Sequence, residues 1–199
     1  MKQFLLSLAA VAVLLAPAAA FAGTWDIDAV HSAVGFKVRH FFTKVPGEFT
    51  DFQGTIDFDP EKPAEAKVNV VIKTASINTN NEKRDNHLRT DDFFSAEKHP
   101  EITFKSTEVR KNDDGYEVDG ILTIRGIEKA VTLQAEFLGA GPDGSGGTRA
   151  GFTATTTIDR KEFGVNWNKT LDHGGALLGD EVAINLDVEA VKKKEESGS

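Results

Sequence analysis

Apolar and polar side chains alternate with a period of two along most of the chain, and this pattern limits the fold more than any other feature. Val34, Phe36 and Val38, for example, alternate with Lys37 and Arg39. Successive side chains of a strand point to opposite faces, so each such run predicts a strand with one face in the core and one in water. Similar runs occupy residues 25–27, 52–58, 68–72, 102–106, 118–124, 131–137, 152–158 and 182–188.

One segment interrupts these strands. Residues 76–81 are rich in side chains that favour helix caps and turns, and few β-branched residues follow them. We therefore expect a short helical segment near residues 82–92, closed by Phe93 and Phe94. The run from Arg84 to Phe94 is also the most charge-dense in the folded part, and we interpret it as a helical plug between two halves of a β-barrel.

Connections between the expected strands are short, which favours antiparallel pairing. Asp113-Asp114-Gly115 is a strong hairpin signal, whereas the glycine-rich tract from Gly139 to Gly147 is expected to be a mobile loop. About nine strand candidates, one helix, no internal repeat and no long linker indicate a single all-β domain. We expect a closed antiparallel barrel of about eight strands, with a β-sandwich as the alternative.

A barrel of about eight strands leaves an interior that side chains can fill or that can hold one small ligand. Small inward residues indicate either tight packing opposite a phenylalanine or open volume, and the sequence allows both. The chain contains 14 Phe, one Tyr and two Trp, so the interior should be apolar and suit a long hydrocarbon better than a sugar or nucleotide. The expected inward positions include Phe36, Phe104, Phe152, Gly54, Gly120, Ala135 and Ala154.

The first 22 residues have the pattern of a Sec-type signal peptide. Lys2 precedes an apolar run over residues 4–15, and Ala20-Phe21-Ala22 is a small-x-small cleavage site. Residues 23–190 are then the barrel domain, and residues 191–199 are expected to be a disordered tail. The chain has no cysteine, which excludes disulfides, thiolate metal sites and lipid attachment at the cleavage site. We therefore expect a periplasmic protein with no stable membrane anchor.

The composition is acidic, with 31 Asp and Glu against 23 Lys and Arg, and the formal net charge is −8. Removal of Lys2 with the signal peptide would leave 22 bases against 31 acids, a net charge of −9. A domain this acidic is not expected to bind nucleic acid, and its net charge does not attract it to an anionic lipid surface.

No arrangement of residues predicts catalysis. A Gly-x-Ser-x-Gly nucleophile elbow is absent, and the adjacent residues His31 and Ser32 would point to opposite faces of a strand. His87 lies near several aspartates, but that cluster has one histidine and lacks the spacing of metal ligands. We therefore expect no enzyme, no catalytic residue, no metal site and no required cofactor. The alternatives are a ligand-free structural or stress-response barrel and, less favoured, an enzyme that acts on a lipid.

Several short motifs follow one another in order between Trp25 and about Ala190. They are Trp25-x-Ile27-Asp28-x-x-His31-Ser32, Phe36-x-Val38-x-His40, Gly47-x-Phe49-x-x-Phe52-x-Gly54, Ser76-Ile77-x-Thr79, Arg84-Asp85-x-His87-Leu88, Asp92-Phe93-Phe94, Pro100-x-Ile102-x-Phe104-x-Ser106, Gly120-x-Leu122-Thr123-Ile124-x-Gly126 and Arg160-x-x-Phe163-Gly164. In order and number these motifs resemble the YceI family of bacterial periplasmic, lipocalin-like proteins. The resemblance implies an antiparallel lipocalin-like β-barrel with a small helical element. It also implies a polyisoprenoid ligand in the barrel, such as a prenyl diphosphate or the tail of a quinone.

Strand parity predicts an apolar barrel wall. The resemblance implies that the partner held by this wall is an isoprenoid lipid or quinone. The predicted wall residues are Phe36, Val38, Phe52, Val70, Ile72, Phe104, Leu122, Ile124, Leu133 and Phe152. Five polar residues of the motifs have either a structural role, which we favour, or a role in head-group binding: His31, His40, Arg84, Asp85 and His87. An exposed edge strand would also permit a homodimer.

Overall fold

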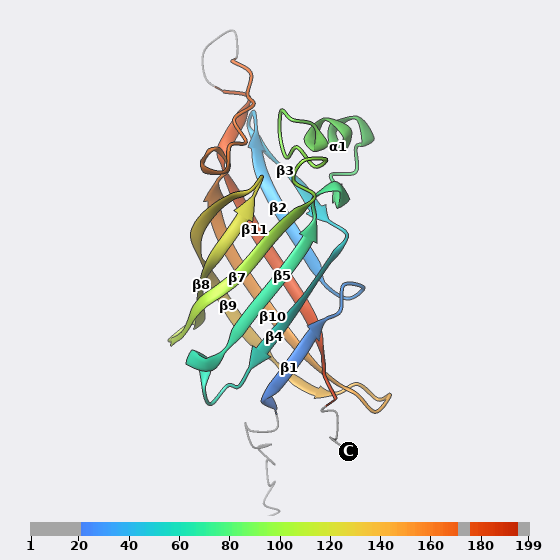
Figure 1. The fold of residues 1–199 in the computed structure, drawn as a ribbon, viewed down its shortest axis with the longest axis vertical. Coiled ribbons are helices and arrows are strands. Elements are labelled where there is room, and N and C mark those ends of the chain that lie inside the picture. Colours follow the sequence, from blue (N-terminus) through green and yellow to red (C-terminus); the bar gives the residue numbers. More distant parts are fainter. Residues whose placement is uncertain (1–20, 171–175, 195–199) are drawn as a thin grey trace, which may run out of the picture.

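The structure, a computed structural model, describes residues 21–170 and 176–194 (Figure 1). The predicted signal peptide, residues 1–22, lies almost wholly outside the described residues, as does most of the predicted tail over residues 191–199. The last strand continues to Lys192, two residues beyond the expected end of the barrel domain. Among the described residues, no helix has both the length and the apolar character needed to cross a membrane.

Strands dominate the described chain. They are β1 (Gly23–Ile27), β2 (Ala33–His40), β3 (Thr43–Phe49), β4 (Phe52–Phe58), β5 (Lys67–Lys73), β6 (Ile77–Asn78), β7 (Glu101–Asn112), β8 (Gly115–Ile124), β9 (Ile127–Pro142), β10 (Thr148–Asp159) and β11 (Leu178–Lys192). The helical elements are α1 (Glu82–Arg89) and short 3-10 turns at Pro63–Glu65, Thr74–Ser76 and Arg160–Phe163.

Eight antiparallel strands close into a barrel, which confirms the expected fold class. Around the barrel the order is β1, β4, β5, β7, β8, β9, β10 and β11, and pairing of β11 with β1 completes the ring (Figure 1). β11 is long enough to pair with β1 through residues 190–192 and with β2 through residues 178–187. β2 pairs in turn with β3, and β3 pairs with β6, so these strands extend the wall at the end of the barrel that α1 occupies.

Two-residue turns join several neighbouring strands. Asp113 and Asp114 connect β7 to β8, as the Asp-Asp-Gly sequence predicts. Arg125 and Gly126 connect β8 to β9 with positive φ angles of 54° and 71°, the pattern of a type I′ hairpin turn. The twist of such turns matches the twist of the strands, so the hairpins form locally and fix the antiparallel register.

The glycine-rich tract from Gly139 to Gly147 is only partly a loop, which corrects the expectation from sequence. Its first four residues belong to β9 and pair with β10. Only residues 143–147 form the connection, in which the Asp143 carboxylate accepts backbone hydrogen bonds from Ser145 and Gly147. Glycine remains in the strand here because the neighbouring strand provides partners for its backbone groups.

The helix α1 confirms the short helical segment predicted from sequence. Asn81 caps its N-terminus: the side-chain oxygen of Asn81 accepts a hydrogen bond from the Arg84 N–H at 3.0 Å. The segment after the helix folds back to the barrel wall, where the Arg125 guanidinium donates hydrogen bonds to the carbonyl oxygens of Asp91 and Phe93. The helix and this segment lie together at one end of the barrel (Figure 1).

Small residues on the inner face of the barrel have both of the roles that the sequence allows. A Cβ atom at Gly120 would lie 2.4 Å from Cζ of Phe104, so the glycine makes room for that ring. Ala135 and Ala154 pair with each other across β9 and β10, and both line an internal cavity. Glycine therefore permits tight packing against aromatic rings, whereas these alanines leave volume open.

We expect the change Gly54→Ala to destabilise the barrel. A Cβ atom at this position would lie 2.5 Å from the backbone oxygen of Asn69 and 2.9 Å from Cδ1 of Ile27, so the backbone of β4 or β5 must shift. Overpacking of this kind costs about 1–3 kcal/mol. Thermal unfolding should show a midpoint lowered by roughly 2–12 °C.

The matched control is Gly141→Ala, because a Cβ atom at Gly141 would have no neighbour within 4 Å. This control should unfold at the temperature of the unaltered protein or slightly above it, since alanine limits the unfolded chain more than glycine does. Equal midpoints for the two variants would contradict the close strand approach at Gly54.

Candidate functional site

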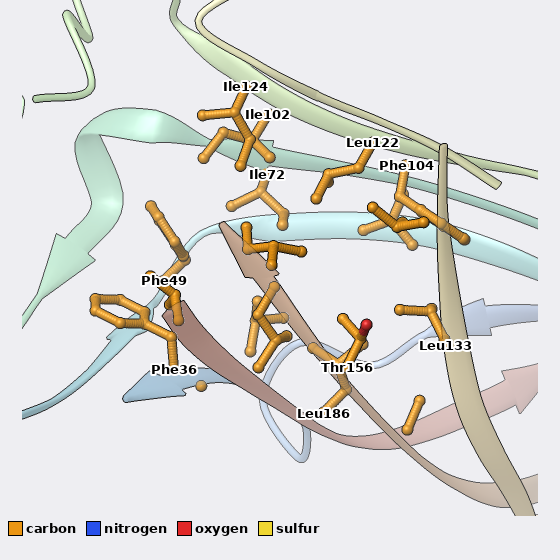
Figure 2. A pocket seen from close by; sticks show the side chains of 18 of the residues that line it. Phe36, Phe49, Ile72, Ile102, Phe104, Leu122, Ile124, Leu133, Thr156 and Leu186 are labelled. Atoms are coloured by element: carbon orange, nitrogen blue, oxygen red, sulfur yellow. The ribbon is translucent and has the colours of Figure 1, made fainter. Parts of the chain in front are cut away.

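A cavity of about 640 Å³ runs through the interior of the barrel. Its wall consists of apolar side chains that point inward from strands on opposite sides (Figure 2). This volume is within the range of about 300–1,000 Å³ that small-molecule sites occupy. Each residue of the predicted wall lines the cavity: Phe36, Val38, Phe52, Val70, Ile72, Phe104, Leu122, Ile124, Leu133 and Phe152.

Aromatic rings fill the end of the barrel at which β1 begins and β11 ends. The Phe58 ring centroid lies 5.1 Å from that of Phe137, 5.6 Å from that of Phe152 and 5.4 Å from that of Tyr116. Burial raises the pKa of the Tyr116 phenol, which keeps it neutral in this apolar setting. Trp25, fully buried, packs in the same cluster. Four of these rings line the cavity and form its floor: Phe58, Tyr116, Phe137 and Phe152.

The opposite end of the cavity, which we call the mouth, lies under α1 and carries most of its polar lining. His87 of α1 forms edge-to-face contacts with Phe93 and Trp167, at centroid distances of 5.0 Å and 5.2 Å. Phe93 and Trp167 are themselves 5.2 Å apart, so the three rings form one group at the rim. A hydrogen bond between Nε2 of His87 and Oδ2 of Asp92, 2.9 Å long, fixes the imidazole.

Hydrogen bonds join α1 to the short segment that links it to β6. The Asp85 carboxylate is buried and accepts hydrogen bonds from the backbone N–H and the hydroxyl of Thr79. Arg84 donates to the same residue, from Nε to the Thr79 hydroxyl oxygen at 2.7 Å and from Nη2 to its carbonyl oxygen at 2.8 Å. The structure thus places Asp85 in a structural contact, while Arg84 makes such a contact and also lines the cavity.

Arg160 is a site residue to which the sequence reasoning assigned no role, although it begins one of the motifs. Its guanidinium is buried and donates to the carbonyl oxygens of Gly179, Val165 and Trp167. It also forms an ion pair with Asp180 at 3.3 Å. Burial lowers the pKa of Arg160, against the opposing effect of the nearby carboxylates. Arg160 therefore holds the segment that places Trp167 at the mouth.

The charged lining of the mouth is basic. His40, Lys83, Arg84, His87 and Arg160 line this end of the cavity. Among the described residues, the one carboxylate that lines the cavity belongs to Glu136, which neighbours Phe137 at the floor. The mouth thus differs in charge from the protein as a whole, whose net charge is −8.

His31 lies outside the cavity, in contrast to His40 and His87. It is exposed in the turn after β1, where Nδ1 lies 2.9 Å from Oδ2 of Asp28. The Arg149 guanidinium lies 2.6 Å from Asp28 and 2.5 Å from Glu189. The network joins the turn to β10 and β11 on the outside of the barrel, so His31 has a structural contact and does not line the cavity.

We expect the change Arg149→Gln to lower stability in a pH-dependent way. Asp28 accepts a hydrogen bond from Arg149 and interacts with His31. These two contacts, the first with the larger effect, hold the pKa of the Asp28 carboxyl well below its usual range. A lowered carboxyl pKa stabilises the fold above the unfolded-state value of about 3.9, and this stabilisation is lost as the pH falls. Urea unfolding at pH 7 should show a loss of about 1 kcal/mol, and the difference should shrink below about pH 4.

Lys62→Gln is the control, because Lys62 and Glu65 are 3.9 Å apart and both are exposed. That variant should match the unaltered protein at both pH values. A loss for Arg149→Gln that is equally large in acid and at neutral pH would contradict the ion-pair explanation.

Comparison with known proteins gives a consistent set of relatives. A family model described as the YceI-like domain matches residues 25–190. A UPF0312 protein of Photorhabdus laumondii is 43% identical over 197 residues, which cover 98% of this chain and 100% of that protein.

Two solved structures extend the comparison. The YCEI protein of Campylobacter jejuni is 37% identical, with a TM-score of 0.67 over 78% of this chain and 90% of that chain. A polyisoprenoid binding domain from Saccharophagus degradans, described as implicated in plant cell wall breakdown, has a TM-score of 0.62 over 85% of this chain and 98% of that one. The sequence of that domain is 14% identical to this chain, and at this level of identity the likeness shows a shared fold alone.

Proposed function

This chain belongs to the YceI-like family, and on that premise we propose that it is a periplasmic carrier that holds one long isoprenoid chain in its barrel. The ligand is a polyprenyl lipid or the tail of an isoprenoid quinone. The single observation that carries the proposal is the continuous apolar cavity of about 640 Å³. A filled structural barrel would have side chains packed across this space.

The shape and chemistry of the cavity favour a long hydrocarbon. Its wall is apolar from the aromatic floor to the mouth, and its polar lining is concentrated at the mouth. A chain threaded from the mouth would bury its tail against Phe, Leu, Ile and Val side chains and leave its head group at the rim. The polyisoprenoid binding domain of Saccharophagus degradans, with the same fold, supports this ligand class.

Binding of this kind requires no chemical step. Each methylene removed from water contributes about 0.8 kcal/mol before the costs of association. The affinity should therefore come from the tail, and the head group should contribute selectivity at the mouth. The periplasmic location in the proposal rests on the signal-like pattern of residues 1–22.

The affinity should rise with the length of the prenyl chain. In a series of prenyl alcohols that differ only in the number of isoprene units, each added unit should tighten binding by roughly tenfold or more until the cavity is filled. Native mass spectrometry or a fluorescence titration can measure this dependence. An affinity that is independent of tail length but sensitive to the head group would contradict the proposal.

A bulky side chain in the cavity should block the tail. Ala154 lines the cavity, so the change Ala154→Phe fills part of the space in which the chain would lie. We expect the affinity for long prenyl alcohols to fall by roughly tenfold or more, with little change in the unfolding temperature. The control is Thr155→Phe, whose side chain is exposed on the opposite face of the same strand. Equal affinities of the two variants would place the ligand elsewhere.

A further inference from the structure

The turn between β2 and β3 exposes two large aromatic side chains. Phe42 is 97% exposed and Phe41 is 43% exposed. The two residues form the whole connection, because His40 pairs with Thr43 at the end of the hairpin. We call Phe41 and Phe42 the aromatic tip.

The aromatic tip is unfavourable for folding. Phe41 has a φ angle of 52°, and Phe42 is not among the residues with positive φ. A positive φ at the first of two turn residues is the pattern of a type II′ turn, in which glycine is preferred at that position. A phenylalanine there strains the backbone, and Phe42 beside it exposes nearly its whole ring to water. The Phe41 ring packs edge-to-face on His40 at a centroid distance of 4.9 Å, whereas Phe42 is almost wholly exposed. A strained turn that carries such an exposed ring points to a function outside the folded core.

The aromatic tip lies at the mouth of the cavity. His40 and Val45, on the two strands of the hairpin, both line the cavity. The backbone N–H of Phe41 donates to the carbonyl oxygen of Leu177, another lining residue, at 2.9 Å. β2 ends and β3 begins on the same side of the barrel as α1 (Figure 1). A surface that receives the tip would therefore come close to the opening of the cavity.

The hairpin that carries the aromatic tip is basic, and among the carboxylates of the neighbouring strand β11, Asp180 lies near enough to Arg39 to interact with it electrostatically. From Lys37 to Gly47 the hairpin carries Lys37, Arg39, His40 and Lys44 and no acidic residue. Arg39 places its guanidinium behind the tip, where Nη1 donates to the Phe41 carbonyl oxygen at 2.9 Å. Exposed aromatic rings flanked by basic residues are the combination that anchors proteins in the interface of an anionic bilayer.

We propose that the aromatic tip docks this protein on an anionic phospholipid bilayer by inserting Phe41 and Phe42 at the level of the lipid head groups. Arg39 and Lys44 then contact the anionic head groups, and the mouth faces the membrane surface. Docking itself is independent of what the cavity holds, whereas its use in collecting or delivering a prenyl chain rests on the proposed function. The net charge of −8 does not oppose this contact at short range, because the basic hairpin is the part that meets the bilayer.

Flotation with lipid vesicles tests the proposal. Protein recovered from the periplasmic fraction is mixed with vesicles of phosphatidylethanolamine and phosphatidylglycerol, and the bound fraction is measured against vesicle concentration. The protein should bind, and it should bind more weakly at high salt or to vesicles of phosphatidylcholine alone. Failure to bind the anionic vesicles would overturn the proposal.

The decisive variant combines Phe41→Gly with Phe42→Ser, which gives the turn the residues that its backbone prefers. Its affinity for the vesicles should fall by roughly tenfold or more, because the variant lacks the two rings that docking would bury in the bilayer. Its unfolding temperature should stay the same or rise. Undiminished vesicle binding, or a clear fall in the unfolding temperature, would overturn the proposal, since the latter outcome would give the rings a role in folding.

Two controls separate the remaining outcomes. Val30→Ser removes another exposed apolar side chain, 86% exposed in the turn between β1 and β2, and should leave vesicle binding unchanged. Light scattering after size exclusion measures whether the unaltered protein is a dimer and the double variant a monomer. That result, in a protein that does not bind vesicles, would mean that the tip binds a second copy of the chain, and it would overturn the proposal.

Uptake of a prenyl alcohol added in ethanol, without vesicles, should be equal in the double variant and the unaltered protein. If neither protein takes up the prenyl alcohol but the unaltered protein binds vesicles, the carrier function is refuted and the docking proposal stands. Loss of uptake in the double variant alone would mean that the tip belongs to the binding site, which would overturn its assignment as a docking element.

Discussion

Closure of the strand ladder between β1 and β11 is the constraint on which the rest of the structure depends. Trp25, Asp26 and Ile27 of β1 pair with residues 190–192 of β11, and this pairing turns an open sheet into a ring. A ring of eight strands encloses an interior that side chains can fill or that can hold one small ligand. Because one face of every strand points into this ring, the alternating sequence makes the interior apolar.

The two ends of the barrel differ, and this difference gives the cavity a direction. Phe58 and its aromatic neighbours fill one end, and most of the polar lining lies at the other. At the mouth, residues of α1 line the cavity, and the buried contact between Asp85 and Thr79 joins the helix to the segment after β6. Arg160 holds the segment whose Trp167 ring contacts His87 of α1 at the rim. Polar groups are thus concentrated at the one place where a head group would meet water.

The period-two pattern was sufficient to predict an all-β domain and the inward faces of the strands, but it left a β-sandwich open as the alternative to the barrel. Phe104 and Leu122, for instance, could be assigned to one side of the sheet because a strand allows a side chain only two directions. The same pattern could not show whether inward residues meet one another or leave space. That outcome depends on contacts between distant strands, as Gly120 against Phe104 and Ala135 beside Ala154 illustrate.

The polar residues of the site were harder to predict because their roles depend on tertiary contacts. His31 and His87 belong to motifs of equal strength, yet His31 lies outside the barrel wall and His87 lies at the mouth. Arg160 follows a regular strand, and its burial arises from backbone carbonyls that the chain supplies up to nineteen residues later. The glycine tract after Phe137 stays in β9 because β10 provides its backbone partners. None of these outcomes follows from local sequence.

The most direct test of the carrier function is native mass spectrometry of the protein as purified from its own cell, followed by organic extraction. The structure leads us to expect one apolar chain bound per barrel, released on unfolding and identified as a prenyl compound. A mass that matches the polypeptide alone, together with no uptake of an added long-chain quinone or prenyl alcohol, would contradict a ligand-holding cavity.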